Sequence, residues 1–268
     1  MSLPSWDAPG AERPRVVSHS CSNTEIICAL GCADLLVGVD EHSDYPVDVV
    51  GSLAKVGADL DVDPHKVRAL RPDLVIASDT VPGHDRCIEK LRDEGLNVEV
   101  IAPRSLQDVA EDIRTIGGLL GVPERGQSLA AAFENQLAND AQEYQSRPPV
   151  LVEWWPKPVI VPGKQSWVSQ LLRLAGGFNP WEDRDAESLP VQPQEVIAAA
   201  PEAVVISWCG VAEEKYHQHV VQRRAGWESV PAVTNDRIFP VTEAWLGRPG
   251  PRLVNGLQAL RRVVSSIS

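Results

Sequence analysis

The stretch "PERGQSLAAAFENQLANDAQEYQSR", residues 123–147, determines how the rest of the sequence is divided. It holds no strand-like run and, after Gly126, no residue that breaks a helix. Its apolar residues recur at the spacing of a helix: Leu129, Ala132, Phe133 and Leu137. About 20 residues of helix span about 30 Å. We therefore predict one long helix here, ended by Pro148 and Pro149.

Alternating strands and helices are predicted on both sides of this helix. Apolar runs such as "LLVGVD", "LRPDLVIAS" and "NVEVIAP" precede it, and "VLVEWW" follows it. Such alternation is typical of parallel sheets covered by helices. The predicted fold class is α/β, with two Rossmann-like lobes, residues 15–122 and 148–268, joined by a bridging helix within residues 123–147. Residues 1–14 form an N-terminal extension, and a ligand cleft is expected between the lobes.

The two halves of the sequence also resemble each other. The segment "PHKVRALRPDLVIAS", from Pro64, aligns without gaps on "PQEVIAAAPEAVVIS", from Pro193. The matching residues fall in the same helix–turn–strand pair of each half. We interpret this match as a sign of duplicated lobes.

The segment "HSCSNTEIICALGC", residues 19–32, follows the first predicted strand, residues 15–18. Ser22 and Glu25 fit a capping box at the start of a helix. Gly31 fits the left-handed residue that ends one. The segment therefore predicts a strand, a polar turn and a helix.

Three cysteines in this segment raise the question of a metal site. Cys21 and Cys28 would lie about 10 Å apart along the helix axis, too far to share one zinc ion. Cys28 is predicted to be buried on the helix, and Cys32 to lie just after it, so we expect no metal bridging the three. His19 and Cys21 would lie at the C-terminal end of the first strand, where open α/β sheets bind ligands.

Composition and charge exclude several classes of partner. The 268 residues carry a net charge of −12, which argues against nucleic acid and anionic membranes. No segment is long and apolar enough to span a bilayer, so membrane insertion is not expected. Five cysteines, an odd number, favour free thiols in a reducing compartment. The N-terminus lacks a signal-peptide pattern, so the sequence as it stands predicts a cytoplasmic protein; a trimmed signal would make it periplasmic or otherwise extracytoplasmic.

Over residues 15–264 the chain resembles a known family. The segments that carry the resemblance include "RVVSHSCSNTEIICALGCADLLVGVDEHSDYP", "KVGADLDVDPHKVRALRPDLVIAS", "RSLQDVAEDIRTIGGLLG", "LLRLAGGFNPWED" and "GWESVPAVTNDRIFPVTEAWLGRPGPRLVNGLQAL". In this order they are similar to the periplasmic-binding-protein-like family for cobalamin, haem and ferric siderophores. The segments "SDYP" and "VEWWPKPVIVPGKQSW" resemble its cobalamin-binding subset most. The resemblance implies two α/β lobes bridged by a rigid helix, which close little on the ligand.

The resemblance and the strand ends together indicate ligand-binding residues in the first lobe. These are His19, Cys21, Ser22, His42, Tyr45, Ser78, Asp79 and His84. The three histidines among them are candidate axial ligands for the metal of a bound chelate, since a neutral imidazole coordinates cobalt or iron. The alternative for each histidine is a solvated position in a loop.

Tryptophan is unusually frequent, with eight residues against three phenylalanines and three tyrosines. Four tryptophans follow predicted strand ends in the second lobe: Trp154, Trp155, Trp208 and Trp245. Broad indole rings suit a corrin or porphyrin, although some of these residues could instead fill the core. Arg248 is a candidate contact for a ligand carboxylate, amide or phosphate. Its alternative role is to begin a helix beside Pro249 and Pro251.

The resemblance also bears on transport. Family members that serve a transporter present a glutamate on each lobe to arginines of the membrane permease. In this sequence His65 and Gln194 occupy the matching positions, so the docking glutamates are absent. Asp61 and Asp63 are candidate substitutes on the first lobe. We favour a protein that does not dock on an importer of this type.

No catalytic constellation is visible, so we expect no enzyme, no intrinsic cofactor and a monomer. Residues 213–224 are predicted to form a solvated helix with His217 and His219 on different faces. Three hypotheses follow. The preferred one is a soluble protein that binds a corrinoid or a related metal chelate. The second is the solute-binding component of an ABC importer for cobalamin, ferric siderophore or haem. The third is an enzyme or chaperone of corrinoid handling.

Overall fold

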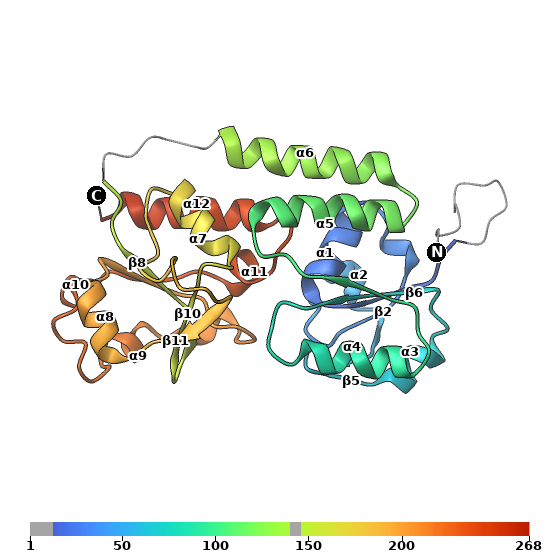
Figure 1. Ribbon diagram of the computed structural model, residues 1–268, viewed down its shortest axis with the longest axis horizontal. Coiled ribbons are helices and arrows are strands. Elements are labelled where there is room, and N and C mark those ends of the chain that lie inside the picture. Colours follow the sequence, from blue (N-terminus) through green and yellow to red (C-terminus); the bar gives the residue numbers. More distant parts are fainter. Residues whose placement is uncertain (1–12, 140–145, 268) are drawn as a thin grey trace. The chain divides into compact units, whose positions relative to one another are not determined.

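The computed structural model describes residues 13–139 and 146–267 (Figure 1). The chain forms two compact units. Unit 1 comprises Met1–Pro103 and Gln107–Glu134, and unit 2 comprises Arg104–Leu106 and Asn135–Ser268. The final passage from unit 1 to unit 2 takes place within helix α6 (Pro123–Asn139). Residues 140–145, where the predicted helix continued, and residues 1–12 of the predicted extension lie outside the described part.

A five-stranded parallel sheet forms the centre of unit 1, in the order β3–β2–β1–β6–β7. The strands are β1 (Val16–His19), β2 (Leu36–Val39), β3 (Ala54–Lys55), β6 (Leu74–Ser78) and β7 (Val98–Ile101). The helical segments are α1 (Cys21–Ala29), η1 (Ala33–Leu35), α2 (Val47–Val50), α3 (Pro64–Ala69), α4 (His84–Asp93) and α5 (Leu106–Leu119). This arrangement confirms the predicted α/β class. A short antiparallel pair, β4 (Gly57–Ala58) and β5 (Asp61–Val62), was not predicted.

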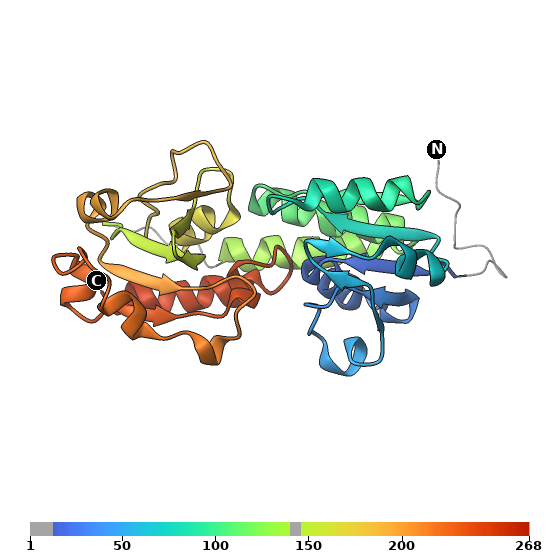
Figure 2. The same cartoon turned by 90° about the horizontal axis from the view of Figure 1, so that it is seen from below.

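The sheet of unit 1 lies between two layers of helices. Helices α1 and α5 lie on one side, and α3 and α4 on the other (Figures 1 and 2). Apolar side chains fill the space between the sheet and α3 and α4: Val17, Val67, Val75, Cys87 and Leu91. Because side chains alternate along a strand, His19 shares the face of Val17, whereas Ser18 faces α1.

Two glycines allow α5 and α6 to approach closely within unit 1. A β-carbon on Gly117 would lie 2.7 Å from Gly126 Cα, and one on Gly126 would lie 3.1 Å from Gly117 Cα. Real side chains do not tolerate such contacts with backbone. Gly126 therefore marks a helix–helix contact, and α6 continues past it.

Helix α1 begins earlier than predicted. Its N-cap is Ser20, not Ser22, and no side chain caps it. Ser22 is the second residue of the helix, and its Oγ bonds Ser20 Oγ at 2.8 Å instead of capping the helix. The C-terminal end is as predicted. Gly31 has φ +71°, and Cys32 N donates to Ile27 O at 3.1 Å, which is the bond pattern of a Schellman cap.

The cysteines of this segment depart from the prediction at one position. Cys28 is only half-buried, because it lies toward the end of α1. Burial and the nearby Glu25 and Asp48 nevertheless raise the pKa of Cys28 to about 11, so it stays a thiol at neutral pH. Cys32 lies just after the helix, as predicted, and is buried.

Unit 2 combines two three-stranded sheets. The parallel sheet has the order β13–β12–β8, with β8 (Val150–Glu153), β12 (Ala203–Ile206) and β13 (Ile238–Pro240). An antiparallel sheet of β9 (Trp155–Pro156), β10 (Val159–Pro162) and β11 (Ser188–Pro190) was not predicted. The helical segments are α7 (Trp167–Leu174), α8 (Pro193–Ala199), η2 (Glu213–Lys215), α9 (Gln218–Gln222), α10 (Pro231–Thr234), α11 (Glu243–Leu246) and α12 (Leu253–Ser265).

The predicted repeat reappears in the structure of both units. Pro64 begins α3 before β6, and Pro193 begins α8 before β12. Between helix and strand, Arg71 (φ 48°) and Ala200 (φ 44°) occupy the matching position, and each is a non-glycine residue in the left-handed region. β1 pairs with β6 in the same register as β8 with β12. His19 at the end of β1 therefore corresponds to Glu153 at the end of β8.

The predicted helix over residues 213–224 is interrupted. His217 is the extended N-cap of the short helix α9, so it does not share a helical register with His219. The two rings instead stack, with centroids 5.3 Å apart and planes at 20°. The prediction that they lie on different faces is therefore wrong.

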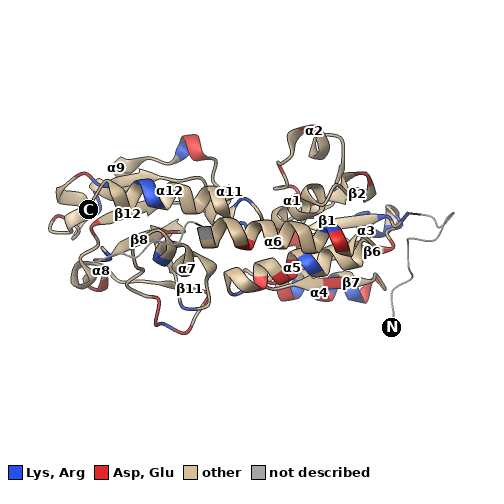
Figure 3. Cartoon of the chain, turned by 90° about the horizontal axis from the view of Figure 1, so that it is seen from above, with Lys and Arg blue, Asp and Glu red and all other residues tan. Residues whose placement is uncertain are grey.

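Charged residues cover the outer helices of unit 1. Both acidic and basic side chains lie along α4 and α5 (Figure 3). Within the described ranges, no helix combines the length and the apolar character needed to cross a membrane.

Candidate functional site

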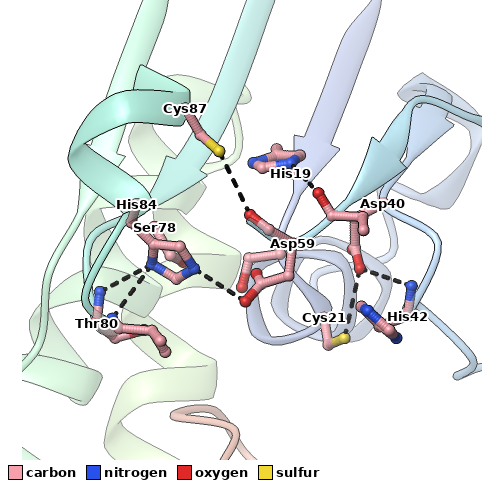
Figure 4. Close-up of polar contacts among 12 residues, drawn as sticks. His19, Cys21, Asp40, His42, Asp59, Ser78, Thr80, His84 and Cys87 are labelled. Atoms are coloured by element: carbon pink, nitrogen blue, oxygen red, sulfur yellow. Dashed lines mark hydrogen bonds and ion pairs between the residues drawn. The ribbon is translucent and has the colours of Figure 1, made fainter. Parts of the chain in front are cut away.

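Polar side chains gather at the carboxyl edge of the unit 1 sheet, where β1, β2 and β6 end (Figure 4). His19, the last residue of β1, is 2% exposed, and its Nε2 lies 3.2 Å from the carbonyl oxygen of Ala58. Burial lowers the pKa of His19, although Asp40 and Asp59 oppose this effect. His19 is thus a neutral, buried imidazole with one ring nitrogen already bonded.

His84 is the first residue of α4 and is also buried. Its Nδ1 accepts hydrogen bonds from the backbone N–H groups of Thr80 (3.1 Å) and Val81 (3.3 Å). Its Nε2 lies 3.0 Å from Asp59 Oδ2, a close contact whose angle is poor for a hydrogen bond. Burial opposes ionisation of Asp59, but His84 and the more distant His19 outweigh it and lower the pKa of Asp59. Nδ1 of His84 is therefore engaged by two hydrogen bonds, whereas Nε2 contacts the Asp59 carboxylate without a well-formed one.

His42 differs from the other two histidines because its side chain is exposed. Its backbone N–H donates to Asp40 Oδ1 at 2.9 Å. The buried Asp40 also accepts from Ser43 Oγ and, at 3.7 Å, from Cys21 Sγ. Asp40 thus organises the loop after β2, and it places the ring of His42 at the surface.

The remaining candidates of unit 1 divide into buried and accessible residues. Ser22 and Ser78 are buried, and Ser78 Oγ accepts from Asn23 Nδ2 at 3.2 Å, so both belong to the polar contact between α1 and the sheet. Asp79 is half-buried, with its backbone N–H bonded to Ile101 O at 2.9 Å. Tyr45 is 46% exposed.

The loops at this edge expose apolar side chains that the sequence interpretation missed. Among the described residues, four of the six most exposed large apolar side chains lie here: Tyr45, Val47, Leu60 and Val81. Residues 40–46, 59–60 and 79–83 contain five acidic residues and no lysine or arginine. Lys55, at the end of β3, bonds the carbonyl oxygens of Ser43 (2.8 Å) and Asp40 (3.4 Å). The edge therefore exposes apolar side chains, and more acids than bases lie near them: Glu41 and Asp44 are exposed and Asp59 and Asp79 half-buried, whereas Asp40 is buried and Lys55 is bonded to the loop.

The corresponding edge of unit 2 is built around a buried ion pair. Glu153 is fully buried at the end of β8. Arg224 donates to its two carboxylate oxygens at 2.6 and 2.9 Å, and Trp208 Nε1 donates at 2.9 Å. The guanidinium also lies 4.3 Å from the ring centroid of Trp227. A carboxylate with this many partners is satisfied internally and is not open to a ligand.

The four predicted tryptophans fall into two classes. Trp154 and Trp208 are 9% and 6% exposed. Trp208 belongs to the core, where it meets Tyr216 edge-on at 5.6 Å and accepts its hydroxyl bond at 3.0 Å through the backbone carbonyl. Trp155 is 42% exposed, and Trp245 is half-buried. Trp245 lies on α11 and not at a strand end, because β13 stops at Pro240.

Arg248 follows α11 and turns back onto it. Its Nε lies 3.3 Å from Glu243 Oε2, and both side chains are largely buried. This contact neutralises the charge with which Arg248 was predicted to bind an anionic ligand group. The helix expected after Pro249 and Pro251 is α12.

Metal-binding groups are not assembled by the described part of the chain. No cluster of three or more His, Cys, Asp or Glu side chains there has the geometry to hold a metal ion. Cys21 Sγ points to Asp40, and Cys32 Sγ lies 3.7 Å from Leu30 O. Cys21, Cys28 and Cys32 form no disulfide.

The predicted docking positions are equivalent in the two units. His65 and Gln194 are the second residues of α3 and α8, and both are exposed. His65 Nδ1 lies 3.5 Å from Glu94 Oε1, which also pairs with Arg68 at 2.8 Å. On the first lobe, Asp63 caps α3 through the N–H groups of residues 65 and 66, so its carboxylate is engaged.

The chain matches known binding proteins along most of its length. A family model described as "Periplasmic binding protein" matches residues 16–244. The vitamin B12-binding protein of Vibrio cholerae serotype O1 is 29% identical over 246 residues, which cover 91% of this chain and 86% of that protein. YvrC, an uncharacterized ABC transporter substrate-binding lipoprotein of Bacillus subtilis, is 29% identical over 258 residues, covering 93% and 79%.

Solved structures show the same architecture. The apo form of the periplasmic haem-binding protein RhuT from Roseiflexus sp. RS-1 superposes with a TM-score of 0.80 at 29% identity, covering 94% of this chain and all of that one. The periplasmic vitamin B12-binding protein BtuF of Vibrio cholerae superposes with a TM-score of 0.78 at 26% identity, covering 95% and 98%.

Proposed function

We propose, from the premise that this chain belongs to the periplasmic binding protein family, that it binds a corrinoid non-covalently at the carboxyl edge of unit 1. The family model describes binding proteins, and three of the four relatives named above are named for binding vitamin B12 or haem. The role proposed for this chain is therefore binding of a large metal chelate. The choice among chelates rests on the residues of this chain.

The observation that carries the proposal is the apolar, acid-rimmed surface of unit 1. Tyr45, Val47, Leu60 and Val81 expose apolar area there. The adjoining loops hold acids and no lysine or arginine. Haem carries carboxylates and some ferric siderophores are anionic, so acids at the rim repel these ligands. A corrin ring carries neutral amides and methyl groups, which fit an apolar surface with hydrogen-bond acceptors at its edge.

Individual residues are assigned roles by their exposure. His42 is the histidine proposed to approach the metal of the chelate, since His19 and His84 are buried and bonded. Trp155 and Trp245 are the proposed aromatic contacts from unit 2, because Trp208 is part of the core. No resident cofactor is proposed; the chelate is cargo.

An absorbance and fluorescence titration tests this function. Cobalamin should bind at a one-to-one ratio, change the corrin absorbance bands and quench tryptophan fluorescence. Haem and an anionic ferric siderophore should bind at least about tenfold more weakly, a difference of about 1.4 kcal/mol. Tighter binding of haem than of cobalamin would overturn the choice of ligand. His42→Ala should alter the corrin spectrum if the imidazole is an axial ligand.

A second candidate function is the substrate-binding component of an ABC importer. The name of the Bacillus subtilis relative favours it. Against it stand His65 and Gln194, which offer no negative charge at the matching positions of α3 and α8. The importer role would place the protein outside the cytoplasmic membrane. Fractionation of the native organism, together with binding of the purified protein to a cobalamin permease in nanodiscs, separates the two functions.

A further inference from the structure

His84 contacts two loops that come from different parts of the unit 1 sequence. Its Nδ1 holds the loop after β6 through the backbone N–H groups of Thr80 and Val81. Its Nε2 contacts Asp59, in the turn between β4 and β5. One side chain at the start of α4 thus ties together segments that lie about 20 residues apart in the sequence (Figure 4).

The same two loops carry exposed apolar residues of the proposed site. Val81 is 42% exposed and Leu60 is 51% exposed. Val81 donates its own N–H to His84, and Leu60 directly follows Asp59. The loops also touch each other, since a β-carbon on Gly83 would lie 3.5 Å from Leu60 Cδ2. The position of both apolar side chains therefore depends on His84.

The hydrogen bonds fix the protonation state of this ring. Nδ1 accepts two N–H bonds, so its lone pair is used and the single ring proton sits on Nε2, facing the carboxylate of Asp59. A second proton would have to enter at Nδ1. There it would face two N–H donors and could bond neither, so protonation and the two loop bonds exclude each other.

Titratable groups from several elements surround the ring. Asp59 lies in contact from the β4–β5 turn, and His19 approaches from the end of β1. Cys87, one turn along α4, donates its Sγ–H to the backbone carbonyl of Asp59 at 3.7 Å. Asp40 and His42, from the loop after β2, act on His19 and Asp59 at longer range. The Asp59 carboxylate is the charged group in contact with Nε2 of His84.

We propose that His84 is a positioning residue whose neutral ring holds the Leu60 and Val81 loops in place, and whose protonation releases them and weakens ligand binding. The effect on the ligand rests on the proposed function, whereas the effect on the loops does not. Acid pH would then favour release of the cargo from this edge.

Measurements on the ligand-free protein test whether the neutral ring of His84 holds the two loops in place. Ring-nitrogen NMR at about pH 8 should show His84 as the Nε2–H tautomer. Amide-exchange protection of Thr80 and Val81 should fall at least about tenfold as the His84 ring takes up a proton. An Nδ1–H tautomer, or protection that survives protonation of His84, would overturn the proposal.

Ligand titrations with cobalamin then test the coupling. The unmodified protein should bind about tenfold more weakly at about pH 5 than at about pH 8. His84→Asn offers a carbonyl oxygen near the position of Nδ1 and takes up no proton, so binding should no longer weaken between about pH 8 and about pH 5. His65→Gln, an exposed histidine elsewhere in unit 1, is the matched control and should keep the acid loss. Retention of the full acid loss in His84→Asn would contradict the coupling. If cobalamin does not bind at all, the proposed function fails. The amide-exchange data still decide whether His84 holds the two loops.

Discussion

His19 in unit 1 and Glu153 in unit 2 occupy the same place in the duplicated fold, yet their chemistry is opposite. Each is the last residue of the first parallel strand, and each is at most 2% exposed. Unit 1 buries a neutral imidazole there, whereas unit 2 buries a carboxylate neutralised by Arg224. The backbone plan of the two units is shared, and the polar groups at the strand ends are not. In unit 2 the buried carboxylate is fully paired with other side chains of the protein. In unit 1 the buried group at the same position is a neutral imidazole, which can gain a proton.

The next residues along the repeat show the same divergence. Ser78, the last residue of β6, and Ser207, the residue after β12, occupy matching positions of the repeat and are both buried. The residue after them is Asp79 in unit 1 and Trp208 in unit 2. Asp79 is half-buried at an acidic edge, while Trp208 closes the core over Glu153. The residue at this one position of the repeat therefore decides whether the sheet edge is accessible, as in unit 1, or covered by a core side chain, as in unit 2.

The largest effect expected from this comparison comes from Glu153→Gln. Removal of the charge leaves Arg224 buried without its partner, which should lower the free energy of unfolding by about 3–5 kcal/mol. Urea denaturation measures it. Glu195→Gln is the matched control, because the Arg184–Glu195 pair is exposed and should cost under about 1 kcal/mol. An equal loss of unfolding free energy in the two variants would show that the buried Glu153–Arg224 pair stabilises unit 2 no more than an exposed ion pair does.

A second test compares Trp208, which is buried in the core of unit 2, with Trp155, which is exposed. Trp208→Phe should lower the free energy of unfolding by about 1–2 kcal/mol, since it leaves Glu153 without one donor. Trp155→Ala should leave stability within about 0.5 kcal/mol and weaken cobalamin binding roughly ten- to a hundredfold. The reverse pattern, with Trp208 controlling affinity, would place the ligand contact in the core of unit 2.

Asp112 on α5 of unit 1 allows a test of what a partly buried carboxyl group without a hydrogen-bond partner does to stability. Asp112 on α5 is half-buried, and its Oδ2 has no hydrogen-bond partner among the described residues. Burial, with Asp108 and Glu111 nearby, raises the pKa of Asp112 to about 7. The folded state thus holds this proton more tightly than the unfolded one, so stability falls as pH rises from about 4 to about 7.

Asp112→Asn should remove this loss. At about pH 8 it should raise the free energy of unfolding by about 1–2 kcal/mol, after allowance for solvent screening, and at about pH 4 it should change little. Denaturation curves at the two pH values measure the difference. Asp108→Asn, which alters a neighbouring charge on the same helix, is the control and should give a smaller gain. A destabilising Asp112→Asn would mean that its carboxylate is satisfied in solution.

The smallest effect concerns the equivalent positions His65 and Gln194. We expect no measurable binding of the unmodified protein to a cobalamin permease in nanodiscs. The double variant His65→Glu with Gln194→Glu should bind detectably, because each restored charge contributes about 0.5–1 kcal/mol at an exposed contact. Exchange of both residues for alanine is the control. Tight, salt-sensitive binding of the unmodified protein would favour the importer function.

The sequence predicted the backbone plan better than the polar network. The parallel strands, α3 with Pro64, the end of α1 at Gly31 and the helix after Pro123 follow from periodicity and caps, which are local signals. The antiparallel β9–β11 sheet was missed, because its strands of two to four residues leave little periodicity to read.

The candidate site was predicted by position and not by role. Strand ends placed His19 and His84 at this edge of the sheet, but sequence spacing could not show that their ring nitrogens are engaged by Ala58, Thr80 and Val81. Those partners come from other elements of the fold. Asp59 and Leu60 were missed because they lie in an unpredicted hairpin, for which Gly57 (φ 120°) was the available signal.

The corners at Arg71 and Ala200 carry a consequence for how the two units diverged. Each corner holds a non-glycine residue in the left-handed region just before a proline, although the side chains have nothing in common. A strained turn that recurs with different residues must be imposed by the surrounding helix and strand. The helix, corner and strand thus follow the same path in both units, whichever residue stands at the corner. The residue two positions beyond the strand segment shared by both units can therefore be an aspartate in one unit and a core tryptophan in the other without a change in the path of the chain.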